Sequence, residues 1–251
     1  MAKANRRRRG FLRRIVGTLF GALLTLLLLA AAAVLALRWI DPPTSAFMLE
    51  ARWQAFAAGR HDYRTDYRWV DLEQISPQAA LAVIAHEDQQ FPFNYGFDFQ
   101  SIRAAVRAHE RGRRLRGAST LTQQVAKNLF LWSGRSFVRK GLEAGFTVMI
   151  ETFWPKERIL EMYLNIAQFG SGIYGVQAAA ERYFHEPARR LTSTQSATLA
   201  AVLPNPIRLR VDAPSAYVLR QRDWVLQQMA NLGGPAYLQA LKRRDCETCD
   251  R

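Results

Sequence analysis

The sequence has little of what a disulfide-stabilised or metal-binding protein needs. Among 251 residues there are only two cysteines, Cys246 and Cys249, close together near the C-terminus. A redox or zinc site would need a second ligand pair or a surrounding strand–helix unit, and neither is visible. The pair therefore indicates either a disulfide in the C-terminal tail or no specific role.

Strand-like alternation is also scarce, and no internal repeat is present. The best strand candidate is the stretch 67–72. Helix signals are frequent instead: Ser76 before Pro77 is a typical helix start, and Thr120 with Gln123 fits a capping box. A mainly α-helical domain is therefore predicted. Helices are expected to begin near residues 76, 120, 155, 192 and 215, and a mobile loop is expected at residues 110–117.

Acidic residues are outnumbered, with 35 Lys and Arg against 21 Asp and Glu, and the net charge is +14. Seven of the positive charges lie within the first fourteen residues, ahead of an apolar segment. No zinc-ligand spacing or RNA-binding signature accompanies the remaining charge, so nucleic acid is not predicted as a partner. The excess fits an anionic lipid surface or a phosphorylated substrate.

Residues 15–37 form an uncharged apolar run of 23 residues. At ~1.5 Å per residue this run spans the ~30 Å hydrocarbon core of a bilayer. The basic residues that precede it place residues 1–14 in the cytoplasm and residues 41–251 outside it. A cleaved signal peptide is the alternative, but the run is long and contains no clear cleavage site. A single-pass anchor in the inner membrane, with a periplasmic domain, is predicted.

Glu87 and Asp88 stand at the end of the helix predicted from Ser76. A carboxylate at the end of a buried helix can have a raised pKa, which would suit general-base catalysis near neutral pH. The structural alternative is a solvated helix end without a function.

Two further clusters carry polar side chains at helical spacing. In the first, Thr120, Gln123, Gln124 and Lys127 share one face, which suits a sugar and a phosphate. In the second, Arg135, Arg139, Lys140 and Glu143 resemble a cationic clamp for pyrophosphate with a carboxylate beside it. The alternatives are an ordinary solvent-exposed face and a weak surface ion pair.

Two other patterns have competing interpretations. Gly170, Gly172 and Gly175 spell GxGxxG, but they follow a helix instead of a strand, so a dinucleotide site is not predicted. The segment 129–132 (Leu129, Phe130, Leu131 and Trp132) is too apolar for one face of a single helix turn. Membrane contact is predicted for it, and burial in the core is the alternative.

Taken together, five ordered segments resemble the successive motifs of the peptidoglycan glycosyltransferases. They are EDQQFPFNYGFD, GASTLTQQVAKNL, RKGLE, KERILEMYLNIAQFGSGIYGVQAAA and LAAVLPNP. The resemblance covers about residues 73–206. With one anchor and no second catalytic domain, the chain resembles the monofunctional biosynthetic members of that family.

The resemblance implies a lysozyme-like helical large lobe and a small membrane-contacting jaw lobe. It also implies polymerisation of lipid II through β-1,4 linkages, with inversion and release of undecaprenyl pyrophosphate. Glu87 would be the general base on the acceptor hydroxyl, and Glu143 would lie on the donor side. The implied substrate-binding residues are Asp88, Phe91, Gly96, Asp98, Ser119, Thr120, Gln123, Gln124, Lys127, Asn128, Arg135, Arg139, Lys140 and Asn165.

One departure from the family pattern is Asn94, where the family usually has His. Asn forms hydrogen bonds but carries no proton or charge at neutral pH. A degenerate, non-enzymatic scaffold for cell-wall or division proteins is therefore one alternative. A lytic enzyme of the same fold is another, although it has no pyrophosphate for the cationic cluster to hold. No cofactor is implied with certainty, and the sequence leaves open whether Mg²⁺ or Mn²⁺ binds near the donor pyrophosphate.

Overall fold

In the computed structural model, residues 2–99, 103 and 119–242 are described, with side chains from Arg13 onward. The chain divides into two compact units, Met1–Ile40 and Asp41–Arg251. The two cysteines and the loop expected at residues 110–117 lie outside the described residues.

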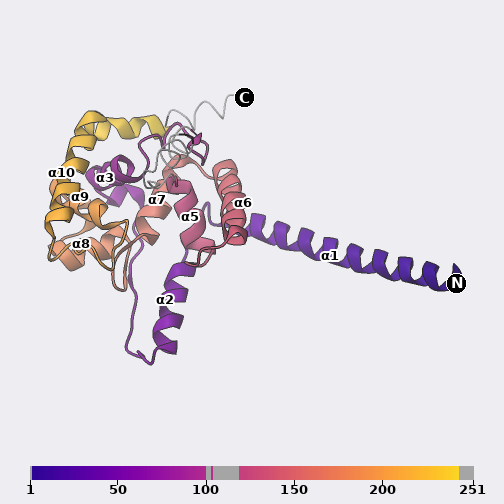
Figure 1. The fold of residues 1–251 in the computed structure, drawn as a ribbon. Coiled ribbons are helices and arrows are strands. Elements are labelled where there is room, and N and C mark those ends of the chain that lie inside the picture. Colours follow the sequence, from indigo (N-terminus) through magenta and orange to yellow (C-terminus); the bar gives the residue numbers. More distant parts are fainter. Residues whose placement is uncertain (1, 100–102, 104–118, 243–251) are drawn as a thin grey trace. The chain divides into compact units, whose positions relative to one another are not determined.

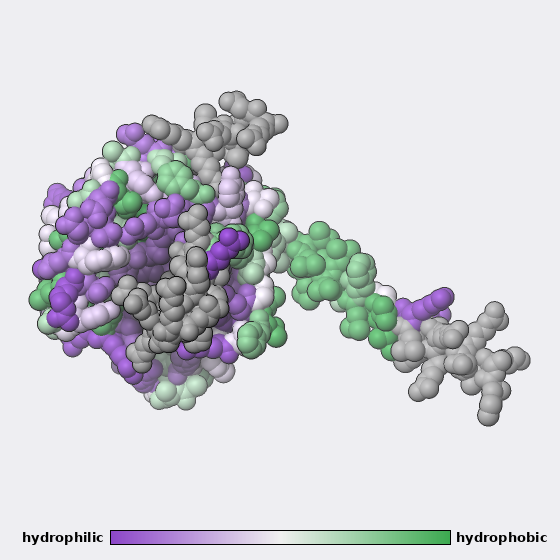
Figure 2. All heavy atoms as spheres, turned by 45° about the horizontal axis from the view of Figure 1, so that its top comes forward, coloured by the Kyte–Doolittle hydropathy of each residue, from purple (hydrophilic) through white to green (hydrophobic). Residues whose placement is uncertain are grey.

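The first unit is built on one long helix, α1 (Ala2–Ala36). Its part Arg13–Ala36 is 24 residues long and has a mean hydropathy of 2.6, so its length and composition suit a membrane span. Large apolar side chains are exposed along this part, and they give the helix its hydrophobic surface in Figure 2.

The second unit is mostly helical, as the sequence predicts, and is consistent with a lysozyme-like lobe (Figure 1). Its longer helices are α2 (Ala46–Ala57), α3 (Pro77–Glu87), α5 (Leu121–Phe130), α6 (Phe137–Phe153), α7 (Lys156–Ile166), α8 (Val176–Phe184), α9 (Ser193–Val202) and α10 (Ala216–Asn231). Short 3₁₀ turns are η1 (Leu72–Gln74), η2 (Ala188–Arg190) and η3 (Gly234–Leu238).

Helices α3, α9 and α10 pack together on one side of this unit (Figure 1). Small side chains allow the close approach: Ala82 and Ala85 of α3 face Ala197 and Ala200 of α9. Val225 and Met229 of α10 complete the same cluster. This packing fixes the C-terminal end of α3, where Glu87 lies, against α10.

Helix α5 packs against α6 and α7, and α2 packs against α5 (Figure 1). Thr120 caps α5 through the predicted capping box with Gln123. Phe130 stacks on Phe146 of α6, with ring centroids 4.5 Å apart. The prediction of membrane contact is wrong for Leu129 and Leu131, because both side chains are buried in the core.

A small sheet of order β1-β3-β2 joins Asp66–Tyr67 (β1), Gln168–Gly170 (β2) and Ile173–Tyr174 (β3). β1 runs parallel to β3, with Asp66 opposite Ile173, and β2 runs antiparallel to β3. The GxGxxG pattern belongs to this sheet. Gly172 and Gly175 have positive φ, and a Cβ at Gly175 would lie 2.6 Å from the Asn165 carbonyl oxygen. These two glycines are therefore required by the backbone.

Candidate active site

Glu87 lies at the C-terminal end of α3, which begins with Ser76 as N-cap and Pro77 in its first turn. Its carboxylate is held at both oxygens. Gln124 Nε2 of α5 donates to Oε2 at 2.7 Å, and His86 Nδ1 lies 2.7 Å from Oε1. Two helices that are distant in sequence therefore fix the orientation of this carboxylate.

The pKa of Glu87 is lowered from its ordinary value of 4.5. Burial alone would raise it, but the hydrogen bonds from His86 and Gln124 and the positive charge of Lys127 outweigh burial. The sequence-based expectation of a raised pKa is wrong for this residue. Because an ionised carboxylate only accepts hydrogen bonds, His86 Nδ1 carries the hydrogen that faces it. At neutral pH Glu87 is therefore an ionised carboxylate that is held in one orientation and can accept a proton.

Glu87 opens into a cleft of about 500 Å³. Ser119 and Gln124 line it on the α5 side, and residues of α10 line it on the other side. The full lining is His86, Glu87, Ser119, Gln124, Pro204, Tyr217, Gln221 and Trp224. A cleft of this size suits one or two sugar rings next to the carboxylate.

A cationic cluster lies near Glu87 between α5 and α6, formed by Lys127, Arg139 and Lys140. Burial lowers the pKa of Lys127, and the neighbouring Arg139 and Lys140 lower it further, while Glu143 and Glu87 raise it. Lys127 Nζ also lies 5.5 Å from the ring centroid of Phe47. The mutual repulsion of these cations favours an added anion, such as a phosphate.

Glu143 is buried at the centre of this cluster. Arg139 Nη1 donates to its Oε2 at 2.7 Å, and Lys140 Nζ pairs with its Oε1. Glu143 therefore positions the two cations and has no free oxygen. Arg139 Nε and Asn128 Oδ1 are buried without a hydrogen-bond partner. Among the described residues, no group of three or more His, Cys, Asp or Glu is arranged to hold a metal ion.

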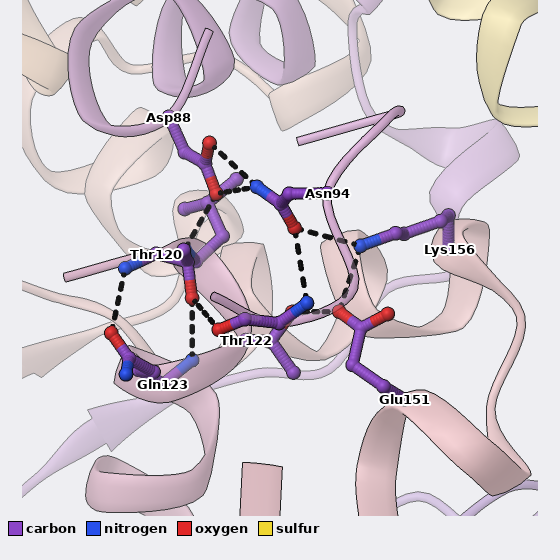
Figure 3. Close-up of polar contacts among 9 residues, drawn as sticks. Asp88, Asn94, Thr120, Thr122, Gln123, Glu151 and Lys156 are labelled. Atoms are coloured by element: carbon purple, nitrogen blue, oxygen red, sulfur yellow. Dashed lines mark hydrogen bonds and ion pairs between the residues drawn. The ribbon is translucent and has the colours of Figure 1, made fainter. Parts of the chain in front are cut away.

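Asp88, next to Glu87 in sequence, has a different environment (Figure 3). Asn94 Nδ2 donates to both of its oxygens at 2.9 Å, and the Leu121 backbone N–H donates to Oδ2 at 3.1 Å. Burial raises its pKa to about 6, despite these hydrogen bonds and the charge of Lys156. Asp88 thus ties the end of α3 to the start of α5 and does not line the cleft.

Asn94 links Asp88 to a buried ion pair (Figure 3). Its Oδ1 accepts from Lys156 Nζ at 3.2 Å and from the Gly96 backbone N–H. Lys156 Nζ also pairs with Glu151 Oε1 at 2.7 Å. Asn94 therefore serves as one donor and one acceptor. The His expected from the family pattern would also offer one donor and one acceptor as a neutral imidazole. Its bare nitrogen has a single lone pair, so it could accept from Lys156 or from Gly96 but not from both.

Several other predicted site residues support the fold. Phe91 is fully buried, with Lys156 Nζ 4.4 Å from its ring centroid. Asn165 is also buried, and its amide bonds both the N–H and the carbonyl of Val70. Thr120 donates to the Gly96 carbonyl at 2.7 Å, and Gln123 is occupied by the capping box.

The remaining predicted residues range from buried to exposed, and Gly96 is buried. A Cβ at Gly96, whose φ is +80°, would lie 2.6 Å from Thr147 Cγ2, so glycine is required there. Asp98 is half-buried, and its negative charge helps to raise the pKa of Asp88. Arg135 is exposed just before α6. Of the predicted residues, the structure gathers Glu87, Ser119 and Gln124 at the cleft, and Lys127, Arg139, Lys140 and Glu143 in the neighbouring cluster.

The sequence analysis did not identify His86, Lys156 or the three residues of α10 that line the cleft. His86 could have been found, because it precedes the candidate base directly. Tyr217, Gln221 and Trp224 fall at i, i+4 and i+7 of a predicted amphipathic helix, so their shared face was also readable. No local pattern marks Lys156 as buried.

A helical domain with one ionised carboxylate in a cleft, and with a cationic cluster beside it, has the parts of a group-transfer enzyme. The carboxylate can take a proton from a hydroxyl, and the cations can stabilise an anionic leaving group. The transglycosylase family model matches residues 54–230, and the chain belongs to this family.

The chain is similar over most of its length to proteins named biosynthetic peptidoglycan transglycosylase. It is 55% identical over 217 residues to the one from Xanthomonas campestris pv. campestris (strain B100), covering 85% of this chain and 88% of the relative. It is 57% identical over 198 residues to that of Escherichia coli O127:H6 (strain E2348/69 / EPEC), covering 78% and 82%. With Cronobacter sakazakii (strain ATCC BAA-894) the identity is 51% over 237 residues, covering 91% and 98%.

Proposed function

We propose that this protein is a peptidoglycan glycosyltransferase that polymerises lipid II into glycan strands. The observation that carries the proposal is the ionised Glu87 in a cleft beside a cluster of three cations. Membership of the transglycosylase family and the names of the similar proteins support it.

In the proposed reaction, Glu87 takes the proton from the 4-hydroxyl of the acceptor sugar. The hydroxyl oxygen attacks the anomeric carbon of the donor, and the bond from that carbon to the pyrophosphate oxygen breaks. A β-1,4 linkage forms with inversion, and undecaprenyl pyrophosphate leaves with the bonding electron pair. Lys127, Arg139 and Lys140 offset the growing negative charge of the leaving group, and Glu143 holds the last two in place.

The test is incubation of the purified full-length protein with labelled lipid II in detergent. We expect a high-molecular-weight product that muramidase digests, together with released undecaprenyl pyrophosphate. Glycan shortening, with lipid II left intact, would instead identify a lytic enzyme. A protein inert towards both substrates would identify a scaffold, and either result would contradict the proposal.

We further propose that α1 anchors the protein in the inner membrane, with residues 1–14 in the cytoplasm and residues 41–251 in the periplasm. Its apolar length and the basic residues before it support this topology. A second lipid contact is assigned to the outer face of α6. Phe137 and Val138 there are 98% and 72% exposed, and Leu142 of the same helix is also exposed. Trp132, which lies between α5 and α6, is exposed as well. Apolar side chains this exposed fit the lipid headgroup boundary.

Removal of residues 2–40 is therefore expected to leave a protein that still floats with anionic liposomes. Changing Phe137 and Val138 to Ser in that protein should weaken vesicle binding about tenfold or more, since burial of each side chain contributes ~1.5–3 kcal/mol. Trp53→Ser is the matched control, because Trp53 is an exposed aromatic residue on α2. Complete loss of flotation on removal of the anchor alone would contradict this second contact.

A further inference from the structure

One face of α10 lines the cleft that holds Glu87, and the proposed reaction assigns it no role. Tyr217, Gln221 and Trp224 line the cleft from this helix. Their spacing of four and three residues places them in one row. The adjacent face of α10 is packed against the domain, because Val218, Val225 and Met229 are buried. The row is therefore held on a rigid element.

Two large aromatic rings remain open to solvent in this row. Tyr217 is 46% exposed and Trp224 is 44% exposed, although both border a cleft. Trp224 meets the ring of His86 edge-on, with centroids 6.1 Å apart and an interplanar angle of 81°. This contact fixes the Trp224 ring close to Glu87 but does not cover it.

The chemistry of the row differs from that of the cationic cluster. Its side chains carry no charge at neutral pH: a phenol, an amide and an indole. The cations Lys127, Arg139 and Lys140 lie on the other side of Glu87, between α5 and α6. An uncharged row of flat apolar faces with polar edges matches a sugar ring, which has an apolar C–H face and a rim of hydroxyl groups. Among the described residues of α10 that line the cleft, none offers a countercharge to a pyrophosphate or an ionised peptide.

We propose that Tyr217, Gln221 and Trp224 form a binding subsite for the acceptor sugar, an aromatic shelf on which the N-acetylhexosamine ring stacks while its 4-hydroxyl faces Glu87. This inference rests on the proposed function, since it assigns the acceptor to the α10 side of Glu87 and the donor pyrophosphate to the α6 side. Gln221 hydrogen-bonds the hydroxyl groups at the edge of the sugar ring. Ser119, which also lines the cleft, lies on the α5 side.

The first test separates acceptor from donor. A lipid II analogue with a blocked 4-hydroxyl serves only as donor, and a disaccharide joined to its lipid through a non-cleavable phosphonate serves only as acceptor. Tyr217→Ala and Trp224→Leu are each expected to raise KM for the acceptor about 3–10-fold, with KM for the donor unchanged. Trp224→Phe keeps a flat ring and should recover most of the loss. Trp53→Leu, which removes an exposed aromatic ring on α2, should change neither KM.

The second test measures binding without turnover in the full-length protein. The N-acetylglucosamine–N-acetylmuramic acid disaccharide, without a peptide, should shift the NMR signal of the Trp224 indole N–H, and the stem peptide alone should not. A shift with the peptide only would overturn the sugar assignment. A fall in kcat with acceptor KM unchanged would also overturn it, because Trp224 would then act only through His86. If the wild-type protein binds the disaccharide but does not polymerise lipid II, the proposed function fails and the subsite stands.

Discussion

Glu87→Gln is expected to reduce the rate of glycan polymerisation by about 10²–10⁴-fold, the usual contribution of a general base. The amide has nearly the same shape and can still accept a hydrogen bond from Gln124, but it cannot take up the proton of the acceptor hydroxyl. The measurement is the initial rate of lipid II consumption by the full-length protein, with the melting temperature recorded in parallel.

The pH dependence gives a second readout for the same residue. Because its environment lowers the pKa of Glu87 from 4.5, the wild-type enzyme should lose this base only as the pH falls below that value. Glu73→Gln provides a matched change at an exposed glutamate and should leave the rate unchanged. Turnover of Glu87→Gln within a few-fold of wild type would remove Glu87 from the mechanism.

Lys156→Met is expected to produce the largest loss of stability, a decrease of about 3–5 kcal/mol in the free energy of unfolding. Lys156 is only 2% exposed and is paired with Glu151, so the substitution removes a positive charge that is paired with a buried carboxylate. It also removes the hydrogen bond to Asn94, which orients Asp88 at the end of α3. Denaturant-induced unfolding in detergent measures the effect.

Two further variants separate loss of the charge pair from loss of packing. Adding Glu151→Gln to Lys156→Met should recover part of the stability, because the carboxylate that Lys156 was paired with is then replaced by a neutral amide. Lys242→Met, at an exposed lysine, should change the free energy of unfolding by less than about 0.5 kcal/mol. A Lys156→Met protein as stable as wild type would show that the ion pair contributes nothing net to the fold.

The sequence alone determined the features that depend on residues close together in the chain. Helix starts were predictable at Ser76, Thr120 and Thr192, because capping uses side chains within three residues of the helix end. The apolar run of α1 and the family resemblance could likewise be recognised from the sequence. Glu87 could be named as a candidate base because it ends a buried helix within a recognisable motif.

Only the tertiary structure decided what surrounds these residues. It placed Gln124 and Lys127 against Glu87 and so lowered a pKa that the sequence suggested was raised. It also turned the adjacent Asp88 towards Asn94 and away from the cleft. Such outcomes follow from contacts between segments far apart in the chain. The sign of a pKa shift, or the burial of a lysine, depends on distances that residue spacing does not specify.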